Sequence, residues 1–424
     1  MNTLSRRHFL KLMGATAAVA ASPAALRAQT TSATGRVVVV GGGFAGATIA
    51  KYLRHWSGGN VAVTLVDANL AHVSCILSNL ALNSSMSLSQ ITFNYEALKQ
   101  KYGVNFVQGR AAGIDNDKQQ LKLDSGILLD YERLILAPGI DFAAIPGLDS
   151  SLVPHAWQAG PQTTLLKQQL AAMPSRGTFV LTIPKAPYRC PPGPYERACV
   201  VADYLKRKKP GSNVIVLDAN PKIMAEEHTF TTAFNQTYAG VIEYHSNVLL
   251  NEVEVVSSTK RIARTSQGNF PAHVLNVIPP QKAGKIVFDV GLVPSGQNWA
   301  SVNPLTYEST LIPGSKIHII GDSQGTSQPK SGHIANAEAK VCADAILRAF
   351  AGEEPDPAPV TNSACYSPIT AKTASWLTAV FAYNPNTGAM EAVPESFGEA
   401  PAATEENYEK MFDWAGNLFG DTFA

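Results

Sequence analysis

The pattern of apolar and polar positions predicts a βαβ unit early in the chain. An apolar, β-branched run from Arg36 to Val40 leads into a glycine-rich turn, Gly41 to Gly46, and then into a helical pattern that continues through Trp56. A second apolar run, Val61 to Val66, ends at Asp67. Short strands on either side of a helix are typical of a parallel sheet. Further strands are predicted at 105–109, 120–123 and 131–137.

A second unit of the same kind begins after Gly177. The pattern predicts a strand from Thr178 to Ile183, a Pro-rich loop, a helix from Tyr195 to Lys208, and a strand from Asn213 to Leu217 that ends at Asp218. This repetition predicts a second domain of the dinucleotide-binding type.

The pattern of the first unit returns late in the chain. Strands are predicted from Val287 to Val290 and from Lys316 to Ile320, followed by a helix from about His333 to Phe350. A Pro-rich, acidic segment, Glu353 to Val360, is typical of a linker. We therefore predict an α/β protein with two Rossmann-like domains and a smaller C-terminal α+β domain. The predicted boundaries are 35–160 with 285–352 for the discontinuous first domain, 161–284 for the second domain, and 361–424 for the C-terminal interface domain.

Residues 1–28 have the features of a twin-arginine signal peptide. The segment Ser5-Arg6-Arg7-His8-Phe9-Leu10-Lys11 precedes an uncharged, Ala-rich stretch and the cleavage site Leu26-Arg27-Ala28. Because this stretch is short and Ala-rich, it favours export to the periplasm over a membrane anchor. Cleavage removes four basic residues and no acidic one, so the formal net charge changes from +1 to −3. The balance does not indicate nucleic-acid binding, and no later apolar run is long enough to span a membrane.

The glycine-rich turn has the features of a dinucleotide site. Gly41, Gly43 and Gly46 have the spacing that gives a tight turn, a close backbone approach and a helix N-terminus for a pyrophosphate. Asp67 ends the next strand, where a carboxylate accepts hydrogen bonds from ribose hydroxyls. The glycine spacing alone is weak evidence, but strand, glycines, helix, strand and Asp follow in the expected order. We predict a bound dinucleotide.

Two later segments favour FAD over NAD. The strand that leads into Ala137-Pro138-Gly139 is similar to the strand and turn before the crossover in flavoproteins with two dinucleotide-type domains. The segment from His318 to Asp322 resembles the strand whose terminal Gly-Asp binds the ribityl chain of the flavin. The alternative is that Asp322 only caps a turn. We assign Ala137, Gly139 and Asp322 to the cofactor site.

The second domain lacks a phosphate-binding turn. Where an NADH-binding domain has glycines, residues 184–194 read Pro-Lys-Ala-Pro-Tyr-Arg-Cys-Pro-Pro-Gly-Pro. Proline has no N–H to donate to a phosphate, and only Gly193 offers an unhindered backbone approach. We expect electrons to come from a substrate and to leave to an acceptor other than a nicotinamide.

The five cysteines all lie in the mature chain, and an odd number leaves at least one unpaired in an oxidising compartment. Three of them lie in distinctive segments, which are His72-Val73-Ser74-Cys75-Ile76-Leu77-Ser78-Asn79, Arg189-Cys190-Pro191-Pro192-Gly193-Pro194-Tyr195-Glu196 and Asn362-Ser363-Ala364-Cys365-Tyr366-Ser367. With this combination, nearly all of the mature chain resembles the flavoprotein subunit of flavocytochrome c sulfide dehydrogenase. This family belongs to the FAD-dependent pyridine nucleotide-disulfide oxidoreductase superfamily, which has a glutathione reductase-like fold.

The resemblance implies roles for these cysteines. Cys75 is expected to carry the FAD through a thioether, and Cys190 with Cys365 to form a redox-active disulfide that hydrosulfide attacks. A disulfide between Cys190 and Cys199 is the competing pairing. Otherwise Cys199 and Cys342 are expected to be inert buried thiols. Glu196 is the candidate base, with a structural role at the start of its helix as the alternative.

The resemblance also implies a c-type cytochrome as partner. This chain has no Cys-x-x-Cys-His motif, so the haem is expected on the partner. One alternative is an enzyme similar to sulfide:quinone oxidoreductase, although the chain ends in an acidic segment that suits anionic lipid poorly. Another is a degenerate flavoprotein kept as a binding module, but such a protein would be expected to lose Cys75, Cys190 or Cys365.

Overall fold

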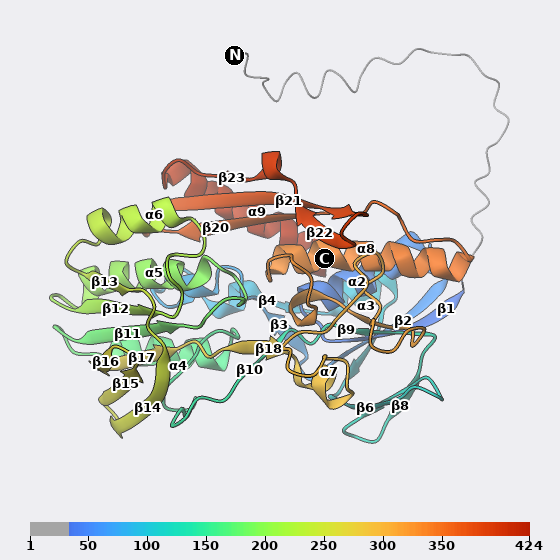
Figure 1. Cartoon of the computed structure of the whole chain (residues 1–424), viewed down its shortest axis with the longest axis horizontal. Helices are drawn as coiled ribbons and strands as arrows, with labels where there is room; N and C mark the ends of the chain where they lie inside the picture. Colours follow the sequence, from blue (N-terminus) through green and yellow to red (C-terminus); the bar gives the residue numbers. More distant parts are fainter. Residues whose placement is uncertain (1–33) are drawn as a thin grey trace, which may run out of the picture. The chain divides into compact units, whose positions relative to one another are not determined.

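A computed structural model describes residues 34–424 of the chain. The predicted signal peptide, 1–28, lies outside the described residues. Figure 1 shows the predicted α/β units side by side, with the last strands and the C-terminal helix above them. The domain boundaries stay a prediction, because contacts join the described residues into one compact unit.

The first sheet contains five parallel strands in the order β19-β9-β1-β2-β5. Strand β1 is buried on both faces, as expected for the centre of a parallel sheet. Val37 and Val39 pack beneath helices α2 and α8, whereas Val38 and Val40 contact the core on the other face. The elements are β1 (Gly35–Val40), α2 (Phe44–Trp56), β2 (Val61–Asp67), β5 (Asn105–Gln108), β9 (Arg133–Leu136), β19 (Ile317–Ile319) and α8 (Gly332–Ala351).

Smaller elements surround this sheet and lead to the second unit. The strands β6, β7 and β8 form an antiparallel sheet, β3 pairs with β4, and β10 pairs with β18. Their bounds are β3 (Ala71–Val73), β4 (Thr92–Asn94), α3 (Glu96–Tyr102), β6 (Ala111–Asp115), β7 (Gln120–Leu123), β8 (Leu128–Asp130), β10 (Ile140–Phe142) and β18 (Gln281–Ala283).

The strand predicted from Val287 to Val290 is wrong, because this segment belongs to helix α7 (Lys285–Asp289). Ile286 and Val287 are buried consecutively, which a half-buried strand does not allow. Lys285 and Asp289 form an i,i+4 ion pair at 2.6 Å, which supports the helical turn. The strand predicted from Lys316 to Ile320 is confirmed as β19, and it joins the first sheet as expected.

The second unit has four parallel strands in the order β13-β12-β11-β17. Helix α5 begins two residues before the predicted start, because Gly193 and Pro194 form its first turn and Pro is well accommodated there. The elements are α4 (Pro161–Ala172), β11 (Thr178–Ile183), α5 (Gly193–Lys208), β12 (Asn213–Asp218), α6 (Glu227–Thr232), β13 (Ile242–His245), β17 (Val274–Val277) and the antiparallel strands β14 (Leu250–Ser257), β15 (Lys260–Thr265) and β16 (Gly268–Ala272).

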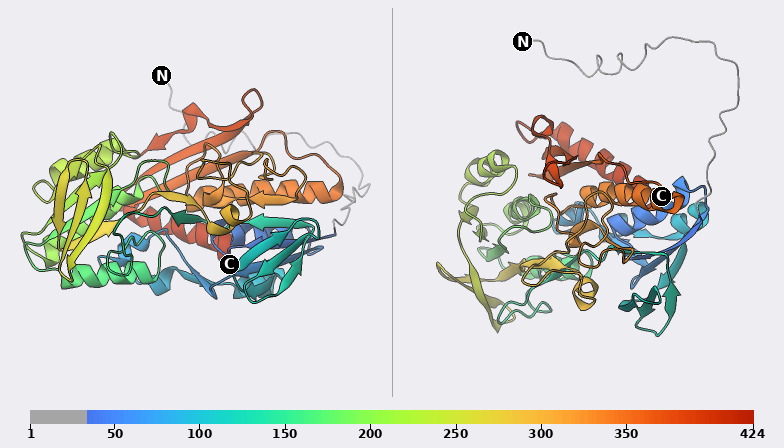
Figure 2. Two further views of the ribbon diagram at one scale, coloured as in Figure 1. Left: turned by 60° about the horizontal axis from the view of Figure 1, so that its bottom comes forward. Right: turned by 45° about the vertical axis from the view of Figure 1, so that its right-hand side comes forward.

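The C-terminal residues form an antiparallel sheet and one long helix. Strand β20 contacts both α8 and α5, and helix α9 packs on α2, so this part of the chain bridges the two α/β units. Figure 2 shows the long strands extending from one unit to the other. The elements are β20 (Val360–Pro368), β21 (Ala374–Asn384), β22 (Ala389–Ala392), β23 (Gly398–Glu399) and α9 (Glu405–Phe423).

Gly46 is a test of the close packing between α2 and β1. A Cβ at Gly46 would lie 1.7 Å from the carbonyl oxygen of Gly41, so the helix must shift in Gly46→Ala. For Gly46→Ala we expect the free energy of unfolding, measured by urea unfolding, to fall by about 2 kcal/mol, as for other overpacked positions. Gly416→Ala is the control, because this exposed helical glycine has open space and alanine should add up to about 1 kcal/mol. Equal stability of the two variants would contradict the packing argument.

Candidate active site

The turn after β1 requires glycine at two positions. Gly41 has φ of +100°, and a Cβ there would lie 2.3 Å from the carbonyl oxygen of Ala137. At Gly46, in the first turn of α2, the carbonyl oxygen of Gly41 leaves no space for a Cβ. The three glycines therefore differ in role. Gly41 and Gly43 line a cavity, whereas Gly46 does not line it and allows the close packing of α2 on the turn.

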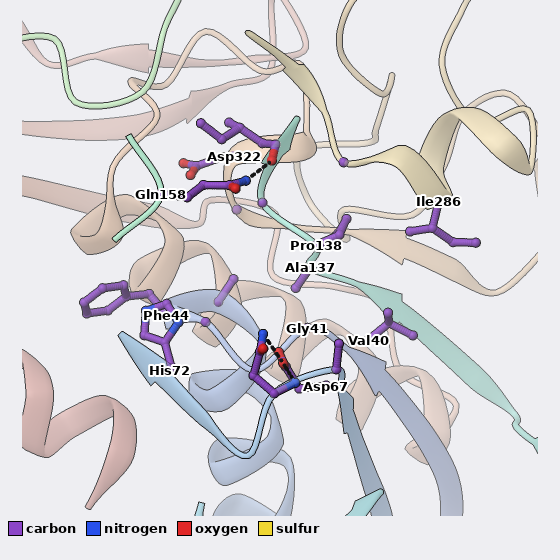
Figure 3. A pocket seen from close by; sticks show the side chains of 18 of the residues that line it. Val40, Gly41, Phe44, Asp67, His72, Ala137, Pro138, Gln158, Ile286 and Asp322 are labelled. Carbon is purple, nitrogen blue, oxygen red and sulfur yellow. Dashed lines mark hydrogen bonds between the residues drawn. The ribbon is translucent and has the colours of Figure 1, made fainter. Parts of the chain in front are cut away.

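Asp67 is fixed at this turn by backbone donors. Its Oδ2 accepts a hydrogen bond from the N–H of Gly42 at 2.6 Å, and its Oδ1 accepts one from the N–H of Asn69 at 2.7 Å. Figure 3 shows Asp67 beside Gly41, with Ala137 and Pro138 between them and Asp322. The carboxylate thus stands where the sequence predicts it, at the carboxyl end of the second strand.

A cavity of about 710 Å³ extends from this turn. Its volume falls within the range of cofactor pockets, about 300–1,000 Å³. The predicted cofactor residues that line it come from five separate segments of the chain: Gly41, Gly43, Asp67, Cys75, Ala137, Gly139 and Asp322.

Asp322 gives this cavity an unused acceptor. The residue lies in the turn after β19, and its Oδ1 is buried with no hydrogen-bond partner in residues 34–424. Its Oδ2 lies 3.8 Å from Nη1 of Arg189. Burial raises the pKa of the carboxyl, and the charges of Arg189 and Lys330 oppose this rise. A ligand hydroxyl at this wall would satisfy the buried oxygen, so the residues present fit a cofactor with a polyhydroxyl chain.

A second, smaller cavity of about 60 Å³ contains the predicted sulfur chemistry. Cys190, from the Pro-rich loop, and Cys365, from β20, line it together with Glu196 of α5. Cys75 lines both this cavity and the larger one. The structure therefore brings together all four of these residues, although each of the five cysteines is a free thiol. Cys199 is buried within α5 and lines neither cavity.

The small cavity disfavours negative charge on sulfur. Burial is the largest cause of the raised thiol pKa of Cys75, of Cys190 and of Cys365, and the last rises to about 12. The charges of Glu226 and Glu196 raise the pKa of Cys365 further. Arg189 opposes the rise at Cys190 and at Cys75. Neutral sulfur species are therefore the stable ones here, whether thiols or a disulfide.

Glu196 is a buried acid with one firm hydrogen bond. Its Oε1 accepts from Nδ2 of Asn79 at 2.9 Å. Burial raises the pKa of Glu196 to about 8, while the hydrogen bond from Asn79 and the charge of Arg197 oppose this rise. The side chain is therefore protonated at neutral pH and can exchange its proton close to that range.

Sequence reasoning missed the residues that hold Glu196 in place. Arg197 is buried and donates to Oδ1 of Asn79 at 2.9 Å, to the carbonyl oxygens of His155 and Ala156, and to Oδ1 of Asn276. An arginine beside a glutamate on an otherwise apolar stretch of helix is a weak signal. Its partners come from distant segments, which the sequence does not connect.

The end of strand β12 is occupied by the protein's own side chains. Asp218 stands where an NAD-binding domain has its ribose-binding acid. Its carboxylate accepts hydrogen bonds from Tyr195 Oη at 2.7 Å, Tyr244 Oη at 2.9 Å and Asn220 Nδ2 at 2.7 Å. Tyr195 belongs to helix α5 and Tyr244 to strand β13, so side chains from these two elements close this position.

Family models match most of the described chain. Residues 35–172 match the pyridine nucleotide-disulphide oxidoreductase model, and 163–279 match the central model of the sulfide dehydrogenase [flavocytochrome c] flavoprotein chain. Residues 357–423 match the flavin-binding model of flavocytochrome c sulphide dehydrogenase. The chain belongs to the flavocytochrome c sulfide dehydrogenase flavoprotein family. This protein binds FAD. The glycine turn, Asp67 and Asp322 line the larger cavity, and their contacts with FAD stay a prediction.

The N-terminal segment also matches a known model. Residues 3–23 match the signal sequence of the twin-arginine translocation pathway, which exports the protein to the periplasm. Among the helices within 34–424, none combines the length and apolar character needed to cross a bilayer.

Curated relatives match a limited segment. The chain is 36% identical over 106 residues to ferroptosis suppressor protein 1 of Taeniopygia guttata, covering 25% of this chain and 27% of that protein. It is 29% identical over 107 residues to a type II NADH:quinone oxidoreductase of Staphylococcus saprophyticus, covering 25% of this chain and 26% of that protein. The chain thus spans about a quarter of the length of these relatives.

Two solved structures have the same fold over most of the chain. The sulfide:quinone oxidoreductase of Aquifex aeolicus has a TM-score of 0.74 at 17% identity, covering 92% of this chain and 93% of that one. An NAD-dependent persulfide reductase of A. fulgidus has a TM-score of 0.62 at 15% identity, covering 91% and 77%. At these identities the likeness shows the fold alone.

The pKa of Glu196 gives the stability a pH dependence. In the unfolded chain this carboxyl loses its proton near its ordinary pKa of 4.5, whereas the folded protein holds the proton to about pH 8. The unfolded state therefore binds fewer protons in this window, and the free energy of unfolding falls as the pH rises from about 4.5 through 8. In Glu196→Gln we expect a flatter curve, measured by urea unfolding at successive pH values.

The matched control is Glu409→Gln, at an exposed position of α9. It should leave the slope unchanged. A slope that is the same in Glu196→Gln and in the unmodified protein would show that Glu196 does not hold its proton on folding.

Proposed function

We propose that this protein is an FAD-dependent sulfide dehydrogenase that oxidises hydrogen sulfide to sulfur or polysulfide and passes the electrons to a c-type cytochrome. The observation that carries this proposal is the small cavity where Cys190, Cys365 and Glu196 meet, with Cys75 in the wall that it shares with the larger cavity. Family membership supports the same reading.

The proposed substrate step is a thiol–disulfide exchange. Cys190 and Cys365 form a disulfide in the oxidised enzyme, and hydrosulfide attacks one of its sulfurs. A sulfur–sulfur bond to the substrate forms as the bond between the two cysteines breaks, which leaves a cysteine persulfide and a cysteine thiolate. The buried cavity disfavours the thiolate, so it must be protonated or must lose its electrons promptly.

Glu196 is the proposed proton donor and acceptor for this step. It lines the cavity with both cysteines, and its pKa of about 8 leaves it protonated at neutral pH. It can donate its proton to the leaving thiolate and recover one when the next hydrosulfide arrives. Asn79 and Arg197 act as positioning residues. Asn79 donates a hydrogen bond to the carboxyl of Glu196, and Arg197 holds Asn79, while Glu196 still lines the cavity.

The proposed cofactor contacts follow the larger cavity. Gly41 and Gly43 are proposed to hold the pyrophosphate, Asp67 the adenosine ribose, and Asp322 the ribityl chain. Ala137 and Gly139 line the same wall. When bound, FAD supplies a two-electron acceptor for the sulfur pair and can release electrons singly. A thioether from Cys75 would anchor it between the two cavities.

The proposed electron acceptor is a haem on a partner protein. The chain has no haem-attachment motif of its own. A nicotinamide is an unsuitable acceptor, because residues 184–194 carry five prolines and Asp218 is engaged by two tyrosines. A c-type cytochrome in the same compartment fits these constraints.

The proposed function is tested by cysteine replacement in the FAD-loaded protein. In Cys190→Ser and in Cys365→Ser we expect sulfide to reduce the flavin more slowly by roughly a thousandfold, because the exchange step is lost. Stopped-flow absorption at the visible flavin band measures this rate. NADH should leave the band unchanged in every variant.

Cys199→Ser is the matched control, since Cys199 lies in the core of α5 away from both cavities. It should keep the full rate of reduction by sulfide. Loss of the rate in Cys199→Ser, with retention in Cys365→Ser, would establish the competing pairing of Cys190 with Cys199. Retention of the rate in both cavity variants would refute the proposed function.

The covalent link is tested separately. After acid denaturation we expect the mass of FAD to stay on the unmodified chain and to be absent from Cys75→Ala, as measured by intact mass spectrometry. Free release of flavin from the unmodified protein would rule out the thioether. Reduction by sulfide would still report on the cysteine pair, so the two proposals fail independently.

A further inference from the structure

A third cavity, of about 400 Å³, lies next to the cysteine cavity. Helix α8, strand β20 and helix α9 form its walls. Asn362 and Val360 on β20 and Asn417 on α9 are exposed, so the cavity has a solvent-facing rim. The substrate step and the cofactor contacts proposed above involve residues of the other two cavities.

Two rings separate this outer cavity from the cysteines. His333 and Trp414 are the residues that line both the outer cavity and the small one. His333 is held by the N–H of Ala364, which donates to its Nδ1 at 2.9 Å. The ring of Trp414 lies near those of His333 and Tyr366, with centroid distances of 6.1 and 5.5 Å. The barrier is therefore one layer of side chains.

Trp414 also presents an unused donor at this barrier. Its Nε1 is buried and has no hydrogen-bond partner in the described part of the chain. Burial lowers the pKa of His333, which keeps its ring neutral at physiological pH. An anion that passes this barrier would meet an N–H donor and no fixed negative charge from these two rings.

The two cavities differ in the room that they offer a product. The space open to a water-sized sphere is about 60 Å³ in the small cavity and about 400 Å³ in the outer one. The outer cavity is several times larger and combines apolar Val341 and Leu418 with the side-chain amide of Asn417 and the ammonium of Lys340. Lys340 is paired at 2.7 Å with Asp421, which also lines the cavity, so the two charges offset each other and this wall is close to neutral.

We propose that the outer cavity is the product site, where a hydropolysulfide anion leaves the cysteine pair past Trp414 and His333. The inference rests on the proposed sulfide dehydrogenase function and extends it to the path of the product. Lys340 and the exposed amides at the rim contact the charged end of the chain, and the apolar wall contacts its sulfur atoms.

The release step balances without a further reactant. Hydrosulfide first opens the disulfide to a persulfide and a thiolate. A second hydrosulfide attacks the outer persulfide sulfur, the bond from that sulfur to the cysteine breaks, and HS–S⁻ leaves. One proton stays on the cysteine that carried the persulfide, so the pair is left as one thiol and one thiolate. The cysteine pair closes again by losing one proton and two electrons, for which FAD, when bound, would be the acceptor. Attack by HS–S⁻ in place of hydrosulfide gives longer chains.

The test fills the outer cavity and measures the product. Ala337, on the wall formed by α8, is replaced in Ala337→Phe, and Asn362, at the exposed rim, is replaced in Asn362→Trp. Ala349→Phe is the matched control, because Ala349 is exposed on the same helix and lines none of the three cavities. The FAD-loaded proteins are mixed with sodium sulfide, the products are trapped with a bromobimane, and their chain lengths are measured by mass spectrometry.

In both cavity variants we expect the first reduction of the flavin by sulfide to keep its rate, while repeated turnover falls about tenfold and only the shortest chains are released. Asn362→Trp keeps the test valid if Ala337→Phe fails to fold, since its side chain starts at the surface. Chain lengths and turnover equal to those of Ala349→Phe would overturn the product site.

A slowed first reduction in both cavity variants would also overturn it and would make the outer cavity the entry path of sulfide. Failure of the unmodified protein to be reduced by sulfide would instead refute the proposed function itself. The two failures are therefore distinguishable.

Discussion

The buried guanidinium of Arg197 is the interaction on which the site depends. An arginine removed from water must have its N–H groups paired, because an unpaired buried charge costs several kcal/mol. Here the partners come from three separate segments: Asn79, the carbonyls of His155 and Ala156, and Asn276 on β17. The guanidinium also lies 4.8 Å from the ring of Trp157. Helix α5 can therefore be buried only when these segments are in place around it.

The same cluster sets the chemistry of the cysteine cavity. Asn79 accepts from Arg197 through its Oδ1 and donates to Glu196 through its Nδ2, so one amide fixes both neighbours. Burial that is tolerable for an arginine with four hydrogen bonds is costly for a carboxylate or a thiolate with fewer partners. This raises the pKa of Glu196 and of the cysteines and favours neutral forms. In the proposed reaction the hydrosulfide anion adds a negative charge to the cavity, and the protonated Glu196 can donate a proton to the thiolate that forms.

The C-terminal sheet is what completes this site. Strand β20 carries Cys365 and packs against both α5 and α8, so it contacts the helices of both α/β units at once. Helix α9 contributes Trp414 to the barrier between the cysteine cavity and the outer cavity. Neither α/β unit contains both cysteines of the proposed disulfide. The sulfur chemistry therefore requires the terminal sheet, whereas the dinucleotide turn is complete within the first unit.

The sequence alone determined the local features of this protein. The tight turn at Gly41, the carboxylate of Asp67 and the strands β1, β2 and β11 follow from residue types and periodicity over short stretches, where backbone sterics and burial act locally. The segment at Val287 was misread because a short apolar run fits either a strand or a helical turn until its burial is known. Only the tertiary structure decided that Asn79 and Arg197 hold Glu196 in place. The same is true of the hydrogen bonds that Tyr195 and Tyr244 donate to Asp218. It also decided that two rings separate the cysteine cavity from a larger one. These contacts join segments far apart in the chain, and their energies depend on burial that no single segment has by itself.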